Sequence, residues 1–131
     1  MAKIKFRGGA MLAPTPPAMV SCGTMENANV ITVAWCGILN TIPPKTYISV
    51  RPSRHSHAII KESGEFVINL TPSSLVRAAD YCGTYTGAKV DKFKKCNLTK
   101  VAVEEVAVRL ITNSPDSLMM AWEWREGRTE I

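Results

Sequence analysis

The chain has 131 residues, of which 46% are hydrophobic and 21% are charged. This length suits one domain, and the composition excludes a wholly disordered or collagen-like chain. The apolar stretches end well short of the roughly 18 residues that a membrane-spanning helix needs. The first residues also lack the apolar core of a secretory signal. We therefore expect one cytoplasmic domain over residues 1–131.

The net charge of +5 is concentrated in the first half of the chain. Residues 1–60 carry six lysine and arginine side chains and one glutamate, whereas the basic and acidic side chains of residues 61–131 balance. Excess positive charge on one part of a protein suits a bound anion such as a phosphate. An unevenly charged, solvated surface gives the same pattern, so the charge alone leaves both interpretations open.

The first part of the chain predicts strands joined by turns. The apolar run 18–22 and the β-branched run 30–35 flank a polar turn over residues 24–29, which predicts two antiparallel strands. The pair Pro43-Pro44 then interrupts the chain. The alternating, β-branched residues 46–50 predict a third strand.

A helix and a fourth strand are predicted next. Ser53 can cap a helix over residues 54–62, and Gly64 stands where a left-handed residue ends a helix. Residues 65–70 then alternate with their apolar side chains on one face, as a strand does.

The following segment predicts two more helices. Thr71 followed by Pro72 is a helix start signal, so residues 73–81 should be helical. Gly83 and Gly87 bracket a loop, and Asp91 can cap a short helix that ends at residue 95. Valine content and alternation predict another strand over residues 101–111, and the fragment 121–125 predicts one edge strand. The fold class is mainly β with short helices, arranged as an antiparallel sheet or barrel.

No metal site is predicted. The four cysteines contain no Cys-x-x-Cys pair, which is the usual signature of a zinc site. His55 and His57 would face one way in a strand, but on the predicted helix they point roughly 200° apart.

Three segments gather groups suited to a ligand. The strand at 29–35 could line a pocket with its backbone and the Thr32 hydroxyl, or it could simply be core. The strand-to-helix turn at 49–56 holds two arginines and three serines, which suit a phosphate at a helix N-terminus. An ordinary helix start with solvated arginines fits that turn equally well.

The third segment, residues 81–92, contains two glycines that allow a ligand to approach the backbone, together with two lysines. It lacks the Walker order and the Gly-x-Gly-x-x-Gly order, which disfavours a nucleoside triphosphate hydrolase and a Rossmann dehydrogenase.

The order and spacing of these segments resemble the flavin reductase and flavoredoxin family. The resemblance spans residues 14–115, and residues 116–131 form an atypical tail where family members continue with further barrel strands. It rests on NVITVAW at 29–35, PP at 43–44, YISVRP at 47–52, HS at 55–56, SGEFVINL at 63–70, DYCG at 80–83 and VDKF at 90–93.

The resemblance implies a split β-barrel that binds FMN, incomplete at its C-terminal end, and a homodimer with flavin sites near the subunit interface. It implies three groups of cofactor-binding residues: around the flavin ring, around the phosphate, and closing over the cofactor. These are Thr32, Val33, Ala34 and Trp35; Ser49, Val50, Arg51, Pro52, Ser53, Arg54, His55 and Ser56; and Cys82, Gly83, Thr84 and Lys92.

The expected function is an FMN-dependent oxidoreductase that passes electrons from NAD(P)H or a protein donor through the flavin. Because the flavin itself carries the electrons, we predict no catalytic side chain. One alternative is a flavin-binding electron carrier without reductase activity of its own. Another is a basic nucleic-acid-binding module in residues 1–60, which the absence of evenly spaced stacking aromatics disfavours.

Overall fold

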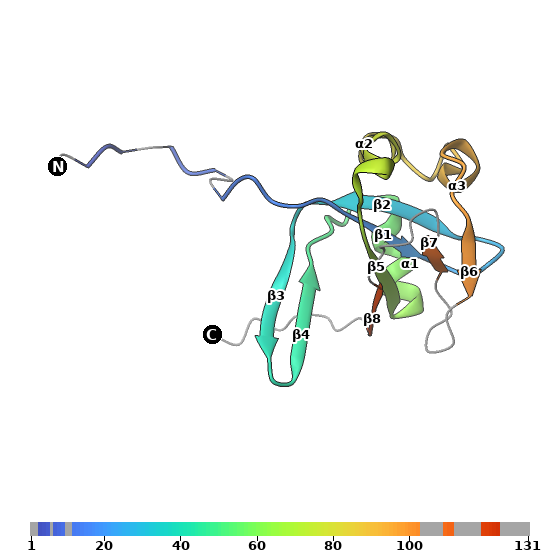
Figure 1. Ribbon diagram of the computed structural model, residues 1–131, viewed down its shortest axis with the longest axis horizontal. Coiled ribbons are helices and arrows are strands. Elements are labelled where there is room, and N and C mark those ends of the chain that lie inside the picture. The colour runs from blue at the N-terminus through green and yellow to red at the C-terminus, as the bar shows by residue number, and fades with distance from the viewer. Residues whose placement is uncertain (1–2, 6, 10–11, 103–108, 112–118, 124–131) are drawn as a thin grey trace.

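The computed structural model of the chain describes residues 3–5, 7–9, 12–102, 109–111 and 119–123 (Figure 1). Its centre is a four-stranded antiparallel sheet in the order β2-β1-β5-β8. The strands are β1 (Ala18–Cys22), β2 (Asn29–Val33), β5 (Glu65–Leu70) and β8 (Met119–Glu123). Every residue of β1 is buried, and β2 lies at one edge of the sheet.

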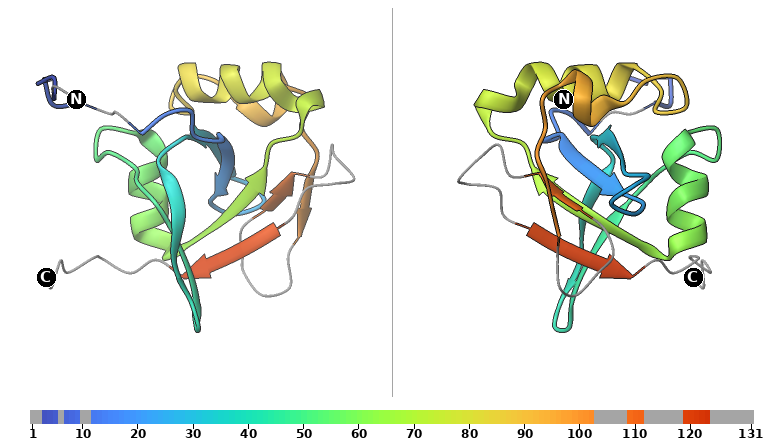
Figure 2. Two further views of the ribbon diagram at one scale, coloured as in Figure 1. Left: turned by 60° about the vertical axis from the view of Figure 1, so that its left-hand side comes forward. Right: turned by 90° about the vertical axis from the view of Figure 1, so that its right-hand side faces the viewer.

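Three of these strands follow the sequence prediction closely. β1 and β5 have the predicted bounds, and β8 overlaps the predicted edge strand at 121–125 and pairs with β5 (Figure 2). β2 begins at Asn29 and ends at Val33, so the predicted extension to Trp35 is wrong. The chain leaves the sheet there and enters a hairpin.

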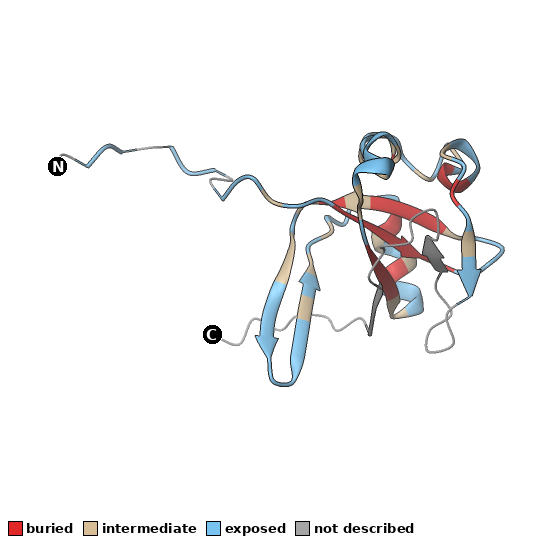
Figure 3. Cartoon of the chain, in the orientation of Figure 1, coloured by how far each residue is buried: buried red, intermediate tan, exposed pale blue. Residues whose placement is uncertain are grey.

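The hairpin consists of β3 (Cys36–Thr41) and β4 (Pro44–Ile48), and it projects from the body of the molecule (Figure 1). β3 was not predicted, because its residues lack the β-branched alternation of a strand. The next strand was predicted two residues too late, because Pro44 is the first residue of β4 and not part of an interruption. Figure 3 shows that most of the hairpin is exposed.

The predicted helices form, but two predicted caps are wrong. In α1 (His55–Ser63) the N-cap residue is Arg54 and no side chain caps the helix, so Ser53 does not have that role. Gly64 ends α1 in the left-handed conformation, as predicted, with φ of 74°. Before α2, Pro72 takes the N-cap position in place of the Thr71 hydroxyl.

A 3-10 turn, η1 (Ser73–Leu75), leads into α2 (Val76–Thr84). Gly83 therefore lies in the last turn of a helix and not in the predicted loop. The Asp91 cap of α3 (Lys92–Lys95) is confirmed, since its side chain accepts a hydrogen bond from the Lys94 N–H at 3.0 Å.

The predicted strand over residues 101–111 is wrong as one element. β6 (Lys100–Ala102) and β7 (Arg109–Ile111) pair with each other in antiparallel fashion. Two strands that pair side by side cannot be one continuous strand, and the residues between them lie outside the described part of the chain.

The core has two parts, one on each face of the central sheet. Val20 packs with Ile60 of α1, whereas its neighbour Met19 packs with Cys82 of α2 and Phe93 of α3. Consecutive residues of a strand point to opposite faces, so α1 covers one face and α2 and α3 cover the other (Figure 2). The mainly β fold with short helices agrees with the prediction, and in the described residues its sheets do not close into a barrel. None of the helices described here is long and apolar enough to cross a membrane.

Candidate functional site

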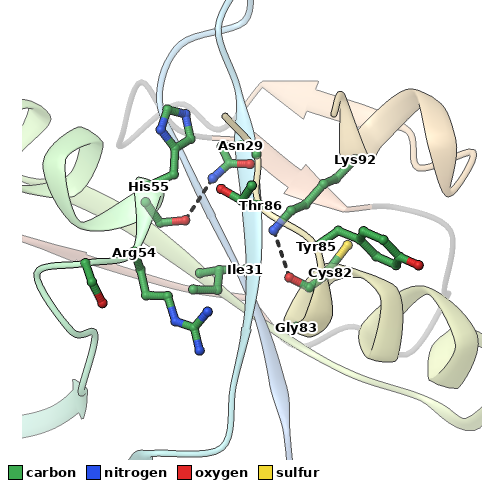
Figure 4. Close-up of a pocket in the computed structure, with 12 residues that line it drawn as sticks. Asn29, Ile31, Arg54, His55, Cys82, Gly83, Tyr85, Thr86 and Lys92 are labelled. Atoms are coloured by element: carbon green, nitrogen blue, oxygen red, sulfur yellow. Dashed lines mark hydrogen bonds between the residues drawn. The ribbon is translucent and has the colours of Figure 1, made fainter. Parts of the chain in front are cut away.

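A cavity of about 90 Å³ lies beside the edge strand β2, between the start of α1 and the segment that joins α2 to α3 (Figure 4). Seven of the predicted site residues line this cavity, and they come from two distant segments of the chain, residues 53–56 and 82–92. The lining residues are Asn29, Ile31, Ser53, Arg54, His55, Ser56, Cys82, Gly83, Tyr85, Thr86, Gly87 and Lys92.

Lys92 is a buried cation at this cavity. Its side chain is 4% exposed, and its Nζ donates hydrogen bonds to the carbonyl oxygens of Val30 and Cys82, both at 2.8 Å. An ammonium group has three donors, so these bonds occupy two of them. Desolvation lowers the pKa of Lys92, and the nearby positive charge of Arg54 lowers it further.

Neither carbonyl that Lys92 contacts carries a full negative charge, and no described carboxylate contacts its Nζ. A buried charge is normally paired, because taking an ion out of water is costly. An anion in the cavity would supply the missing charge. The site therefore favours an anionic ligand group.

Arg54 and the first turn of α1 form the opposite wall. Figure 4 shows Arg54 on the α1 side of the cavity and Lys92 on the side of α2 and α3. The first turn of α1 contains no acidic residue, and it begins with His55 and Ser56. The N–H groups of a helix start lack intrahelical partners and attract negative charge. Both walls of the cavity therefore attract an anion.

The first residue of β2 is held in place by a buried hydrogen bond. Asn29 donates through Nδ2 to Ser56 Oγ at 2.8 Å, and this buried bond ties β2 to α1. Gly87 lies directly over the Asn29 amide, because a Cβ at this position would be 2.6 Å from Asn29 Cγ. Only glycine fits without displacing Asn29.

The outer edge of β2 presents backbone groups that β1 does not pair. Val30 accepts its bond from Lys92, so its carbonyl faces away from β1. Alternation along a strand directs the backbone groups of Thr32 to the same side. The Thr32 side chain is fixed, since its Oγ1 donates to Ala79 O of α2 at 2.6 Å. A ligand beside the strand can therefore reach the Thr32 backbone.

The thiols near the cavity are not ionised at neutral pH. Burial raises the pKa of Cys82 to about 12 and that of Cys22 to about 11. A thiol that stays protonated is a poor nucleophile and a poor metal ligand. In the described part of the chain, no three His, Cys, Asp or Glu side chains gather where they could hold a metal ion.

The other predicted site residues lie elsewhere. Thr32 and Thr84 line a second cavity of about 560 Å³, which also includes Gly83. Seven residues line neither cavity: Val33, Ala34, Trp35, Ser49, Val50, Arg51 and Pro52.

Several of those seven residues have structural roles. Val33 is buried in the core and Val50 packs against it. The Ser49 N–H donates to Trp35 O at 2.7 Å, and this hydrogen bond closes the base of the hairpin. Trp35 itself is 54% exposed. The structure thus brings part of the predicted phosphate and closing residues together, whereas the predicted ring residues are divided among the second cavity (Thr32), the core (Val33) and the hairpin base (Trp35).

The prediction omitted five lining residues, namely Asn29, Ile31, Tyr85, Thr86 and Gly87. Gly87 is one of the two glycines noted in the third predicted ligand segment, but it was not among the predicted cofactor-binding residues. The role of Asn29 depends on Ser56, which is 27 residues away, and no local pattern indicates that pairing.

A model of the flavin reductase like domain matches residues 10–120 of the chain. The chain belongs to this family. An uncharacterised protein of Archaeoglobus fulgidus is 36% identical over 84 residues, which is 64% of this chain and 48% of that protein. One from Pyrococcus abyssi is 30% identical over 103 residues, or 79% of this chain and 59% of that protein. The chain spans about half the length of these curated relatives.

Two solved flavoredoxins share the fold. The flavoredoxin of Desulfovibrio vulgaris (Miyazaki F) has a TM-score of 0.78 and 31% identity over 86% of this chain and 62% of its own. The flavoredoxin of Methanosarcina acetivorans has a TM-score of 0.76 and 25% identity over 94% of this chain and 73% of its own. The predicted family and fold class are confirmed.

Proposed function

We propose that the chain binds FMN and acts as an oxidoreductase of the flavin reductase or flavoredoxin type. The observation that carries this proposal is the buried Lys92 ammonium, which faces Arg54 across a cavity and contacts no described carboxylate. The family of the chain and its flavoredoxin neighbours support the choice of flavin as the ligand.

The residues present fit the phosphate end of FMN. A cavity of about 90 Å³ is far smaller than the roughly 300–1,000 Å³ of a complete small-molecule pocket, so it suits one ligand group. Lys92, Arg54 and the first turn of α1 would hold the phosphate by charge-assisted hydrogen bonds. His55 and Ser56 belong to that turn.

The remainder of the cofactor would follow the open edge of β2. The Thr32 backbone faces that edge, and Cys82, Gly83 and Thr84 close the last turn of α2 beside it. We assign the ring end to the segment from Thr32 to Trp35, and the turn from Ser49 to Ser53 to the phosphate side. The second assignment is supported by Ser53, which lines the cavity.

Bound FMN would supply the electron chemistry, and the protein would bind and orient it. The side chains around the cavity have other tasks. Lys92 and Arg54 neutralise charge, Asn29 fixes the position of Ser56, and Gly87 leaves room above Asn29. The protonated Cys82 thiol offers no nucleophile. We therefore propose no catalytic side chain, with NAD(P)H or a redox protein as the electron donor.

An electron carrier without reductase activity is the second candidate. It is favoured by the two flavoredoxins, which match this chain at 31% and 25% identity. The two candidates differ in whether NAD(P)H reduces the bound flavin directly.

We also propose that the chain forms a homodimer through the β3–β4 hairpin. Ile38, Leu39 and Ile42 of this hairpin are 76%, 66% and 88% exposed. Trp35 at its base is 54% exposed. Several large apolar side chains exposed on and beside one projecting hairpin are typical of a protein interface.

The test is titration of the purified chain with FMN and with riboflavin, which is the same flavin without the phosphate. We expect FMN to co-elute with the protein on gel filtration and riboflavin to bind much more weakly. Equal affinity for the two, or no binding of FMN, would contradict the proposal. Anaerobic NADH and NADPH are then added to the FMN-loaded chain. Rapid bleaching supports the reductase, and persistent yellow colour supports the carrier.

A further inference from the structure

Two of the four cysteines lie against each other between α2 and α3. Cys82 of α2 is fully buried, and Cys96, which follows the end of α3, packs against the same part of the core. The two thiols share a hydrogen bond. Cysteines can form a disulfide only when the fold brings their side chains this close together.

Lys92 fixes the backbone of both cysteines. Its Nζ donates to Cys82 O at 2.8 Å, and its carbonyl oxygen accepts a hydrogen bond from the Cys96 N–H at 3.0 Å. Figure 4 shows the Lys92 side chain reaching to Cys82. One residue therefore holds α2 and α3 together at the position of the two thiols.

The other two cysteines are not placed to form such a pair. Cys22 pairs with Asn29 at one end of β1 and β2, whereas Cys36 follows Val33 beyond the opposite end. Both pack in the part of the core that α1 covers, so the central sheet separates them from Cys82.

The two thiols in contact differ in their access to solvent. Cys96 is partly exposed, whereas Cys82 has no exposed surface, so a reagent in solution meets Cys96 first. Cys82 must then lose its proton to complete the bond. Burial raises the pKa of Cys82 to about 12, and the Lys92 ammonium opposes this rise. The second step is therefore slow at neutral pH, but the contact between the thiols raises its rate.

We infer that Cys82 and Cys96 form a reversible disulfide, with a low-molecular-weight disulfide as the oxidant, and that this bond fixes one wall of the small cavity. In the first step the Cys96 sulfur bonds to one sulfur of the reagent. The S–S bond of the reagent breaks, and its other half leaves as a thiol with the Cys96 proton. In the second step the Cys82 sulfur bonds to the Cys96 sulfur and displaces the remaining half, which leaves with the Cys82 proton. Two protein thiols are oxidised, and one reagent disulfide is reduced to two thiols.

The disulfide brackets the segment that forms this wall. Residues 82–96 contribute half of the twelve residues that line the small cavity, and Lys92 is one of them. Joining the two ends of the segment restricts its motion, and a preorganised wall costs less to order when a ligand binds. We expect FMN to bind the oxidised chain about two- to tenfold more tightly than the reduced chain. This effect on FMN rests on the proposed function, whereas the disulfide does not.

The test begins with the full-length chain, reduced and then freed of reductant. It is incubated with oxidised glutathione at mildly alkaline pH, where more Cys82 is ionised. The remaining thiols are alkylated in denaturant, and peptide mass spectrometry locates the linkage. We expect a bond between Cys82 and Cys96, with Cys22 and Cys36 alkylated. Four alkylated thiols, or a linkage between other cysteines, would overturn the inference.

Thermal unfolding gives an independent readout of the same bond. The disulfide closes a loop of about 15 residues, so the melting temperature should rise by about 10 °C. Dithiothreitol should reverse the rise. A melting temperature that falls on oxidation would show that the fold does not accommodate the bond.

Three variants assign the roles of the cysteines. Cys96→Ser should form no disulfide and gain no thermal stability from glutathione. Cys82→Ala should keep one glutathione attached to Cys96, because the thiol that displaces it is missing. Cys36→Ser is the matched control, since Cys36 is also partly exposed but lies on the other face of the sheet. The control should form the linkage as the parent chain does, and its failure to do so would contradict the assigned pair.

Titration of the reduced and oxidised chains with FMN tests the effect on the cavity. A tighter complex with the oxidised chain supports it, and equal or weaker binding would overturn it. Binding of FMN to neither form would refute the proposed function together with this effect. The mapped disulfide would still stand in that case, so the two proposals fail separately.

Discussion

Replacing Lys92 by methionine tests the central claim about the small cavity. Methionine keeps most of the length of the side chain and removes its charge and its donors. If Lys92 gives one charge-assisted hydrogen bond to the phosphate, the loss is about 1.5–3 kcal/mol. FMN should then bind about ten- to 150-fold more weakly. Riboflavin, which has no phosphate, should bind the variant and the parent chain equally.

The stability of Lys92→Met should change much less than its FMN affinity. The variant loses the two hydrogen bonds to Val30 O and Cys82 O. It also no longer buries a cation that lacks a described carboxylate partner, and this gain opposes the loss. We expect the free energy of unfolding to change by less than about 2 kcal/mol. Circular dichroism checks the fold, and Lys95→Met, on the same helix but exposed, is the control.

The pH dependence gives a second measure of the same group. The folded-state pKa of Lys92 lies below its ordinary value of 10.5, because burial penalises the charged form. FMN affinity should fall as the pH rises through this lowered pKa, since the ammonium is then lost. The flavin-free chain should become more stable over the same interval, because its folded state holds neutral Lys92 more readily than the unfolded state does. Parent-like FMN affinity in a folded Lys92→Met, with a flat alkaline profile, would refute the reasoning.

Three further changes probe the surroundings of the site. Gly87→Ala forces a Cβ to 2.6 Å from Asn29 Cγ, so it should cost roughly 1–3 kcal/mol in chemical denaturation and weaken FMN as well. Gly64→Ala has open space but φ of 74°, so it should cost about 1 kcal/mol and leave FMN titrations unchanged. Ile38→Glu with Leu39→Glu should turn a dimer into a monomer in sedimentation experiments at unchanged circular dichroism. A monomeric parent chain would instead remove the proposed interface.

The parts of the fold that the sequence predicted correctly are those with local signals. β1 and β5 are short apolar runs bounded by turn residues, and Gly64 and Asp91 end or begin helices by their own chemistry. The missed strand β3 has no such pattern. It is defined by pairing with β4, and a Tyr47 ring lies over Gly37 where a Cβ would be 2.9 Å from the ring. A strand whose side chains face solvent need not alternate.

The site was predictable where one segment carries the chemistry, and less so where two segments combine. The arginine- and serine-rich turn before α1 was recognised from its helix start and its charge. The Asn29–Ser56 bond and the contact of Lys92 with the edge of β2 join residues 27 and 62 positions apart. Such contacts follow from the tertiary fold, and the sequence contains no periodicity that encodes them.

Gly83 separates two environments that differ in charge. On one side, Lys92 and Arg54 provide positive charge in a cavity that is too small for a whole cofactor. On the other, the larger cavity has Asp80 and no cation among its described lining. A phosphorylated ligand is therefore attracted to the first side and repelled from the second. If the flavin ring follows the edge of β2 past Gly83, it would reach Thr32 and Thr84 at the rim of the larger cavity while its phosphate stays with Lys92 and Arg54.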